Sequence, residues 1–535
     1  MKTRLFAFVA FMAVPPQFAL QAQVSYERLL NAATDPGNWL MYSGSYSSWR
    51  YSTLDQVRRE NVNRLKVKWV YQMPTTNVVE TTPLVVDGVM YITEPPSNVV
   101  ALDAVTGRAY WRYRRALPDK INVCCGQVNR GVAVAGDRVF LGTVDAHLLA
   151  LDAKTGAVLW DTEVADYRTG HSVTVAPLPI KDMIICGVSG GEYGIRGFLD
   201  AYDQKTGKRR WRFWTVPDPG QPGSGTWSGA AWKTGGGPTW VTGSYDPQLN
   251  LIIWGTGNPS PDWNGDSRPG DNLYTDSAIA LDADTGQLKW HFQFIPHDVH
   301  DWDAVQVPVL VDDEWQGHPR KLVYWAHRGG FYYVLDRETG KFLFGTPFAK
   351  QTWAKGLDPA GRPIRLPNID PTPEGTMLWP GVQGATNWYS PSYNPVDKLF
   401  YLTVWENRGL FLKGEQEYSP GNRYIGSVPT IDLPNDPGHG AIRALNPKNG
   451  ERVWDYPLLT KPTAGVLSTA GKLVFGGSDE DYLFALDAQT GRELWRQNTG
   501  GMIRASPMTY LSRGRQVVAV AAGSAIFAFD LTESQ

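Results

Sequence analysis

Residues 101–111 read ALDAVTGRAYW, and variants of this phrase return along most of the chain. The further copies are ALDAKTGAVLW from Ala150, AYDQKTGKRRW from Ala201, ALDADTGQLKW from Ala280, VLDRETGKFLF from Val334, ALNPKNGERVW from Ala444, ALDAQTGRELW from Ala485 and the truncated echo AFD from Ala528. We expect the apolar-Leu-Asp segment to end a strand, the Asp and Thr side chains to bond nearby backbone, and the glycine to turn left-handed. The tryptophan of the next strand is a large flat side chain suited to packing between neighbouring sheets. The phrase therefore predicts one repeated unit of strand, tight turn and strand.

Repeats of roughly 40 to 50 residues that contain only strands and turns are typical of a β-propeller. The seven clear copies and the echo predict an all-β, eight-bladed β-propeller with tryptophan-docking repeats, with seven blades as the alternative. The long gap between Val334 and Ala444 leaves room for a blade without the phrase, around Ser392 to Trp405, and for insertions. We expect a strand near Val67 to Tyr71 to pair with the last blade, because closing the ring removes exposed sheet edges.

Composition narrows the function classes. The 535 residues carry 51 Lys plus Arg against 53 Asp plus Glu, a formal net charge of −2. This balance argues against a nucleic-acid binder, which needs a basic footprint. Hydrophobic residues make up 42% and charged residues 19%, which argues against disorder.

The N-terminus is typical of an exported protein. Lys2 and Arg4 precede an apolar stretch from Leu5 to Val14, and Ala22 is a plausible cleavage point. We interpret residues 1–22 as a secretory signal peptide and residues 23–535 as a single propeller domain, with the periplasm as the expected location. The apolar stretch is too short to span a bilayer, and we expect no membrane span elsewhere. The three cysteines are too few for a disulfide-stapled scaffold.

Acidic and amide side chains stand in unusual settings between the repeats. Glu192 lies in the glycine-rich stretch GVSGGEYGIRG, and Asn258 follows a strand in GTGNP. Asp298, Asp301 and Asp303 fall within six residues and repel one another unless a cation or solvent screens them. Hard oxygen ligands of this kind suit Ca²⁺ or another hard cation. The alternatives are that Glu192 lies in a surface loop, that Asn258 is a turn residue, and that the three aspartates form a solvated acidic loop.

The adjacent pair Cys124 and Cys125 is a further unusual feature. Neighbouring cysteines can close a small strained ring in an oxidising compartment, and two reduced, buried thiols are the alternative. Arg130 follows in the same stretch and could grip a carboxylate with two hydrogen bonds.

Several of these motifs in one order carry a specific resemblance. NVCCGQVNRG, GVSGGE, GTGNP, RPGDN and PHD…DWD occur along the chain in this order. Together they resemble the pyrroloquinoline quinone (PQQ)-dependent alcohol dehydrogenases of the methanol/ethanol dehydrogenase family, most closely the lanthanide-dependent members. The resemblance runs from about Asn38 to the C-terminus and implies an eight-bladed propeller with PQQ and a metal ion near its axis.

The resemblance implies a role for each matching position. Asp301 matches the catalytic carboxylate, which would remove the proton of the alcohol hydroxyl. The positions that match the metal ligands are Glu192, Asn258 and Asp301. The positions that match cofactor contacts are Glu80, Cys124, Cys125, Arg130, Thr174, Ser189, Gly190, Gly191, Trp240, Arg328 and Asn387. Among these, the Cys124–Cys125 pair matches a vicinal disulfide against one face of PQQ, and Trp240 matches the tryptophan on the other face.

Asp303 bears on the identity of the metal. Calcium-dependent methanol dehydrogenases carry a small residue at the position of Asp303, whereas lanthanide-dependent members carry Asp. A trivalent cation gains more from an extra carboxylate than a divalent one, because the attraction scales with ion charge. We therefore favour a lanthanide ion with Asp303 as its fourth ligand, and Ca²⁺ is the alternative ion.

Departures from the family bear on substrate and partners. The stretch GVLSTA from Gly465 lacks the tryptophan of methanol dehydrogenases, which weakens methanol as the substrate. The haem-attachment motif Cys-x-x-Cys-His is absent, so we expect electrons to pass to a separate soluble cytochrome c.

The expected function is oxidation of a small primary alcohol to an aldehyde. A cofactor-free propeller serving as an assembly scaffold, and a PQQ dehydrogenase for a sugar or polymer alcohol, are the alternatives. A homodimer is an open alternative for the assembly.

Overall fold

The structure is a computed structural model that describes residues 24–427, 431–433 and 436–531. The predicted signal peptide, residues 1–22, lies outside the described residues. In the described part, the single α-helix is α1 (Tyr26–Leu30), and none of the helices there is long and apolar enough to cross a membrane. The short 3-10 turns are η1 (Ala32–Thr34), η2 (Val62–Arg64), η3 (Tyr167–Thr169), η4 (Gly191–Tyr193), η5 (Ser224–Thr226) and η6 (Ala231–Thr234).

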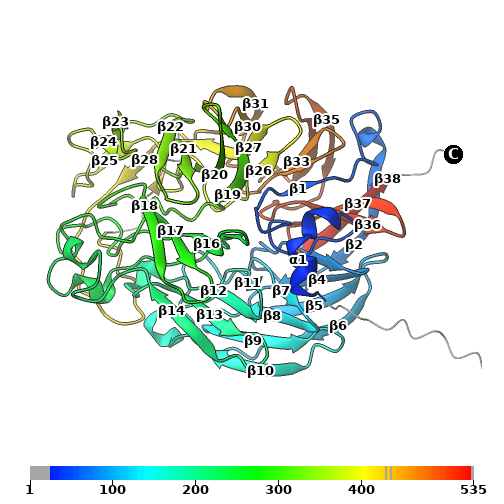
Figure 1. The fold of residues 1–535 in the computed structure, drawn as a ribbon, viewed down its shortest axis with the longest axis horizontal. Coiled ribbons are helices and arrows are strands. Elements are labelled where there is room, and N and C mark those ends of the chain that lie inside the picture. Colours follow the sequence, from blue (N-terminus) through cyan, green and yellow to red (C-terminus); the bar gives the residue numbers. More distant parts are fainter. Residues whose placement is uncertain (1–23, 428–430, 434–435, 532–535) are drawn as a thin grey trace, which may run out of the picture.

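In the described residues, eight blades of four antiparallel strands each, one of them with an added fifth strand, are arranged in a ring, which confirms the eight-bladed propeller (Figure 1). Blades 1 and 2 comprise β3 (Leu84–Val86), β4 (Val89–Glu94), β5 (Asn98–Asp103), β6 (Ala109–Tyr113), then β7 (Ala133–Ala135), β8 (Arg138–Gly142), β9 (His147–Asp152) and β10 (Val158–Glu163). Blades 3 and 4 comprise β11 (Leu178–Ile180), β12 (Met183–Gly187), β13 (Phe198–Asp203), β14 (Arg209–Trp214), then β15 (Ser244–Asp246), β16 (Leu251–Gly255), β17 (Ser277–Asp282) and β18 (Leu288–Gln293).

The second half of the ring repeats this pattern with insertions. Blades 5 and 6 comprise β19 (Val309–Trp315), β20 (His318–Ala326), β21 (Phe331–Asp336), β22 (Phe342–Pro347), then β26 (Ser392–Asn394), β27 (Leu399–Glu406), β30 (His439–Leu445) and β31 (Arg452–Leu458). Blades 7 and 8 comprise β32 (Leu467–Thr469), β33 (Leu473–Gly477), β34 (Tyr482–Asp487), β35 (Glu493–Asn498), then β36 (Met508–Ser512), β37 (Arg515–Ala522), β38 (Ala525–Leu531) and β2 (Leu65–Gln72). A short strand β1 (Tyr51–Ser52) adds to blade 7 in parallel with β32.

Burial follows the position of each strand in its blade. The middle strands, such as β4 and β12, are buried on both faces because each blade packs between two neighbours. The outermost strands β6 and β10 alternate between half-buried and exposed residues. The first strands of adjacent blades contact each other, as β7 does with β11 and β15 with β19, so they face the axis.

In most blades, a tryptophan docks on the glycine of the next repeat. A Cβ atom added at Gly156 would lie 2.5 Å from the Trp111 ring, and the indole Nε1 of Trp111 donates to the Ala153 carbonyl at 3.0 Å. The same contact recurs in the pairs Trp69–Gly107, Trp160–Gly207, Trp211–Gly286, Trp290–Gly340 and Trp454–Gly491. The glycine therefore has two roles: it adopts the left-handed conformation of the turn, and its lack of a side chain lets the neighbouring tryptophan ring pack against the backbone.

The ring closes between the two ends of the described chain. Strand β2 pairs antiparallel with β38, with Val70 opposite Phe527 and Tyr71 opposite Ile526. Figure 1 places β2, in blue, beside the red strands of blade 8. The predicted pairing of Val67 to Tyr71 with the last blade is confirmed.

The expectation for the gap between Val334 and Ala444 needs a correction. Residues Ser392 to Trp405 do form strands, β26 and most of β27, but these belong to the blade that carries the Ala444 copy. Eight copies thus give eight blades, because the echo at Ala528 counts as one. The rest of the gap forms two small added sheets, built from β23 (Ala354–Leu357), β24 (Pro363–Arg365), β25 (Thr376–Leu378), β28 (Gly409–Phe411) and β29 (Ile431–Asp432).

Candidate functional site

A cavity of about 250 Å³ lies where loops from all eight blades converge. Each blade lines it from the segment before its first strand or after its second strand. Because these strands are antiparallel, both segments lie at the same end of the blade. In blade order, the lining residues are Glu80; Cys124, Cys125, Val128 and Arg130; Thr174, Ser189, Gly190 and Glu192; Pro238 and Trp240; Asp301, Asp303 and Arg328; Gln383, Asn387, Trp388 and Tyr389; Lys461 and Thr463; and Arg504.

Most residues predicted for the site meet in this cavity. Asn258 and Gly191 are not among the lining residues. Asn258 is buried directly against the lining, because its backbone N–H donates to Asp303 Oδ1 at 2.7 Å. A Cβ atom added at Gly191 would lie 3.1 Å from Asn258 Oδ1, so this glycine keeps the amide oxygen close to the Glu192 turn.

Carboxylates from blades 3 and 5 form an acidic side of the cavity. Glu192 lies in η4, directly after β12, while Asp301 and Asp303 precede β19. Arg328 follows β20 and lies 3.7 Å from Asp301 Oδ2 through Nη2, and its Nη1 donates to Asp303 Oδ2. One guanidinium thus faces two carboxylates, which leaves the cluster with an excess of negative charge.

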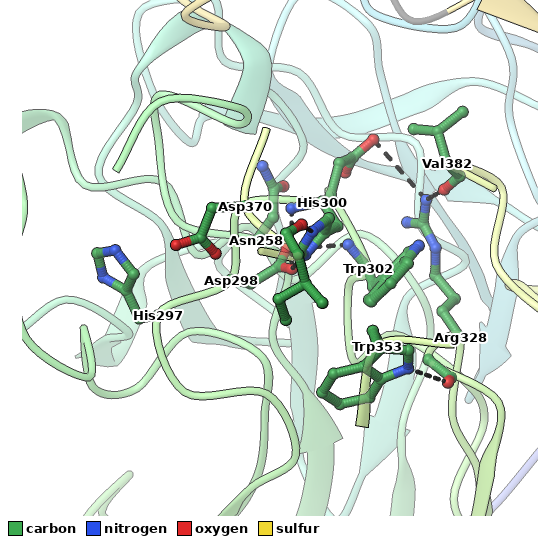
Figure 2. A network of polar contacts seen from close by, with 12 residues as sticks. Asn258, His297, Asp298, His300, Trp302, Arg328, Trp353, Asp370 and Val382 are labelled. Atoms are coloured by element: carbon green, nitrogen blue, oxygen red, sulfur yellow. Dashed lines mark hydrogen bonds and ion pairs between the residues drawn. The ribbon is translucent and has the colours of Figure 1, made fainter. Parts of the chain in front are cut away.

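The backbone at Asp301 is held in a rare conformation. Asp301 has φ +59°, a left-handed value that costs a non-glycine residue about 1 kcal/mol or more. The buried Asp298 carboxylate brackets it, since Oδ1 accepts from His300 N at 3.0 Å and Oδ2 from Trp302 N at 2.9 Å. Figure 2 shows Asp298 beside Trp302, whose indole Nε1 donates to the Gly381 carbonyl at 2.9 Å. This network fixes the direction in which the Asp301 side chain leaves the loop.

Burial makes these acids reluctant to ionise without a counter-charge. It raises the pKa of Glu192 to about 7, and repulsion from Asp303 acts in the same direction. Burial also raises the pKa of Asp301 and of Asp303, although Arg328 opposes both shifts. The pKa of the buried Asp262 is raised as well, by desolvation and by Glu192. A hard cation would relieve this shared deficit of positive charge.

A chain of one ion pair and two hydrogen bonds crosses the other side of the cavity. Arg130 Nη2 lies 2.8 Å from Glu80 Oε2, and its Nη1 donates to Thr174 Oγ1 at 3.0 Å. The Thr174 and Ser189 hydroxyl oxygens lie 2.6 Å apart. The sequence placed these four residues at cofactor contacts, and the structure joins them across blades 1, 2 and 3.

Aromatic and cationic side chains complete this side. The guanidinium carbon of Arg130 lies 4.7 Å from the ring centres of both Trp240 and Trp388. Lys461 and Arg504 line the same cavity from blades 7 and 8. The cavity is therefore anionic toward blades 3 and 5 and cationic toward blades 2, 7 and 8.

The two adjacent cysteines border the acidic side. The Sγ atoms of Cys124 and Cys125 adjoin each other, and both lie within 4.8 Å of a Glu192 carboxylate oxygen. Cys186, in contrast, is buried in β12 and does not line the cavity.

Asn387 lines the cavity, but its amide is held by its own loop. Its Nδ2 donates to the Gln383 carbonyl at 2.9 Å, and its Oδ1 accepts from Trp388 N at 2.8 Å.

Gly190 has φ +125°, and a Cβ there would meet the Gly170 carbonyl oxygen, so this turn requires glycine.

Comparisons with known proteins identify the family. Residues 39–351 match the family described as glucose/ethanol/alcohol dehydrogenase, β-propeller domain. The chain is 40% identical to quinohemoprotein alcohol dehydrogenase ADH IIB of Pseudomonas putida, over 95% of this chain and 76% of that protein. It is 39% identical to quinoprotein alcohol dehydrogenase PedH of the same species, over 94% and 89% of the two chains. The chain belongs to the PQQ-dependent alcohol dehydrogenase family. A solved europium-containing methanol dehydrogenase superposes on this dehydrogenase with a TM-score of 0.89 at 32% identity, covering 94% of this chain and all of the other.

A second family match bears on the scaffold alternative. Residues 438–534 match the outer membrane protein assembly factor BamB. This stretch contains the last repeats, but most of the residues that line the cavity precede it. The match therefore reflects the shared repeat, and the dehydrogenase assignment is confirmed by the first family and the full-length relatives.

The donor set fits a hard cation. Glu192, Asp301 and Asp303 offer carboxylate oxygens. Asn258 directs its NH₂ group to Asp262 Oδ1 at 2.9 Å, which leaves its amide oxygen available as a metal ligand. Oxygen-only donors with excess negative charge suit calcium and other hard ions rather than soft metals.

The opposite side fits a flat anionic quinone. Trp240 offers an aromatic face, while Arg130, Lys461 and Arg504 offer positive charge for carboxylates. Arg328 belongs to the acidic side through its contacts to Asp301 and Asp303.

Sequence reasoning missed several lining residues. Trp388 directly follows Asn387 in the stretch GATNW, residues 384–388, and its position could have been included. Arg504 begins the sequence RASP before β36, just as Glu80 begins ETTP before β3 and Thr174 begins TVAP before β11. This recurring place, three residues before the proline, is a signal for axial residues. No such signal marks Lys461.

Proposed function

We propose that this enzyme oxidises a primary alcohol to an aldehyde with PQQ and a lanthanide ion in the central cavity, with Ca²⁺ as the alternative ion. The observation that carries the proposal is the division of one cavity into an oxygen-rich acidic side and a cationic, aromatic side. The acidic side suits a hard ion, and the cationic, aromatic side suits an anionic ring, so the two sides together suit an ion next to a ring.

Asp301 is the proposed general base. When bound, PQQ would supply the two-electron oxidant and the ion a Lewis acid. Asp301 would take the proton of the alcohol hydroxyl, and the bracket formed by Asp298 keeps its side chain directed for this task. Arg328, 3.7 Å from Asp301 Oδ2, favours the ionised carboxylate that a base requires and would stabilise negative charge nearby.

The residues around the ring position would bind and shield the cofactor. Arg130, held by Glu80 and Thr174, is the proposed partner of a cofactor carboxylate. Trp240 would cover one face. We propose that Cys124 and Cys125 form a vicinal disulfide that covers the other, consistent with the adjacent Sγ atoms.

A lanthanide is favoured over calcium because of Asp303. Its carboxylate lies in the wall of the cavity beside Asp301 and Asn258, which adds a charge to the proposed ligands. The attraction of an added charge for a trivalent ion is about 1.5 times that for a divalent ion at equal distance. The europium-containing relative is consistent with this choice.

The cellular setting is part of the proposal. We propose export to the periplasm, from the signal-peptide pattern of residues 1–22, and electron transfer to a separate soluble cytochrome c. The second point rests on the resemblance to the family.

Reconstitution tests this function. Purified protein is loaded with PQQ and either La³⁺ or Ca²⁺, and dye-linked oxidation is followed with primary alcohols, sugars and polymer alcohols. We expect turnover of primary alcohols that needs both PQQ and metal and is faster with La³⁺. Turnover only of sugars or polymer alcohols would contradict the substrate class, and no PQQ binding at all would return the protein to the scaffold class.

A further inference from the structure

Asp262 is a buried acid next to the proposed metal ligands with no role assigned so far. It lies four residues after Asn258, in the loop that follows β16, and is 1% exposed. It is not among the residues that line the cavity. A buried carboxylate is costly unless something compensates it, so its position calls for an explanation.

The first contact of Asp262 is with the Asn258 amide. Asn258 Nδ2 donates to Asp262 Oδ1 at 2.9 Å and to the Pro259 carbonyl at 3.2 Å. Both bonds engage the NH₂ group, which leaves the amide oxygen on the side of Gly191, where an added Cβ would lie 3.1 Å from it. Asp262 thus decides which end of the amide faces the Glu192 turn, because a carboxylate accepts hydrogen bonds and cannot donate them.

The loop around Asp262 is fixed on both sides. The Pro261 carbonyl accepts from Arg268 Nη2 at 2.9 Å, and Trp263 N donates to the Ile425 carbonyl at 2.9 Å. Arg268 itself is fully buried, and its Nη2 also donates to the Asp298 carbonyl at 2.7 Å. The carboxylate therefore has little freedom to turn away from Asn258.

The second oxygen of Asp262 has no protein partner. Asp262 Oδ2 is buried and makes no hydrogen bond within the described residues. The hydrogen bonds of the nearby Arg268 guanidinium go to the carbonyls of Pro261 and Asp298 and to Asn272 Oδ1. The Asp262 carboxyl is thus left without a direct ion pair, and a cation bound at the neighbouring ligands would supply the positive charge that keeps it ionised.

We propose that Asp262 is a positioning residue of the metal centre. It orients the Asn258 amide with its oxygen toward the ion, and it adds a buried negative charge behind the ligands that favours a trivalent over a divalent ion. The inference rests on the metal site of the proposed function and deepens it.

Two substitutions separate the bond from the charge. Asp262→Asn retains an acceptor for Asn258 Nδ2 and removes the charge, while Asp262→Ala removes both. Asp266→Asn is the matched control, since Asp266 lies in the same loop but is exposed and pairs with Lys413 Nζ at 2.6 Å. Calorimetric titration of the full-length, PQQ-loaded proteins with La³⁺ and with Ca²⁺ measures both dissociation constants, and thermal unfolding checks that each variant is folded.

We expect Asp262→Asn to raise the Kd for La³⁺ about tenfold, or ~1.4 kcal/mol, and the Kd for Ca²⁺ by less, so that the preference for La³⁺ falls. Asp262→Ala should weaken both ions further, and Asp266→Asn should change neither. A preference for La³⁺ in a folded Asp262→Asn or Asp262→Ala variant equal to that of the wild type would overturn the inference alone. A wild-type protein that binds neither ion would overturn the proposed function and the inference with it.

Discussion

The outer turns and the axial loops of this propeller follow opposite rules. In the outer turns, one arrangement repeats around the ring, as where Asp282 Oδ1 accepts from Thr285 N at 3.0 Å and from Thr285 Oγ1 at 2.9 Å. At the axis, each blade places a different side chain in the cavity, from Glu80 in blade 1 to Arg504 in blade 8. The repeated contacts hold eight sheets in one geometry, and that geometry lets unlike side chains meet.

The difference separates stability from chemistry. The outer contacts are satisfied, with bonds between the Asp and Thr of a turn and between an indole and the next carbonyl. The axial carboxylates are buried with raised pKa values, an arrangement that costs free energy until a cation arrives. Substitutions in the two regions should therefore give opposite results.

The largest effect is expected at Asp301. Asp301→Asn keeps the shape of the side chain but removes the proposed base, so kcat of the reconstituted enzyme should fall about 10³-fold with a nearly unchanged Tm. The contrasting variant is Asp282→Asn in an outer turn, which should lower Tm and leave kcat unchanged. Steady-state assays with thermal unfolding measure both, and an Asp301→Asn enzyme with wild-type turnover would refute the role of this carboxylate.

The next effect is expected at the docking glycines. Gly207→Val should destabilise the protein by about 3 kcal/mol, because a Cβ there would lie 2.7 Å from the Trp160 ring and Gly207 has φ +69°. Gly220→Val is the control, since Gly220 has φ +85° but no atom within 4 Å of an added Cβ, and its cost should be about 1 kcal/mol. Urea unfolding midpoints compare them, and equal losses would show that the tryptophan contact contributes nothing.

The sequence predicted the repeated region far better than the axial one. The Asp-x-x-Thr-Gly-x-x-x-Trp phrase specifies local contacts, so the blades, the docking and the closure by Val67 to Tyr71 followed from it. The gap before Ala444 left room for a blade without the phrase around Ser392 to Trp405, but these strands belong to the blade of the Ala444 copy, because spacing alone does not tell an insertion from a blade.

Axial residues depend on which blades lie across the ring, and this is not a local property. Glu192 and Asp301 were found because their motifs resemble a family. Lys461 lies in a stretch without such a motif, and only the closed ring brings it to the cavity. Asp262 contacts Asn258 within one loop, but it lies outside the GTGNP motif, so the resemblance did not single it out.

A third, smaller effect concerns the choice of metal within the axial region. Asp303→Ala should lower La³⁺-supported activity about 30-fold and Ca²⁺-supported activity clearly less, because the lost attraction scales with the charge of the ion. Initial rates with each ion at saturating PQQ measure this. Equal losses with both ions would count against Asp303 as the source of lanthanide preference.

The smallest effect is a pH dependence of metal binding. The pKa of Glu192 is raised to about 7 by burial, so below pH 7 a proton competes with the cation for this carboxylate. The Kd for La³⁺ should therefore rise roughly tenfold as the pH falls from 7.5 to 6.0. Calorimetric titrations at several pH values test this, and a constant Kd over that interval would mean that Glu192 is not a ligand.

The central claim is that the two unlike sides of the axial cavity hold an ion and a flat cofactor together. Crystals of protein reconstituted with PQQ and La³⁺, measured near a lanthanum absorption edge, test it most directly. The account predicts one anomalous peak among Glu192, Asn258, Asp301 and Asp303, beside planar density between Trp240 and the Cys124–Cys125 pair. A lanthanum peak elsewhere, or an axial cavity filled only by solvent, would contradict it.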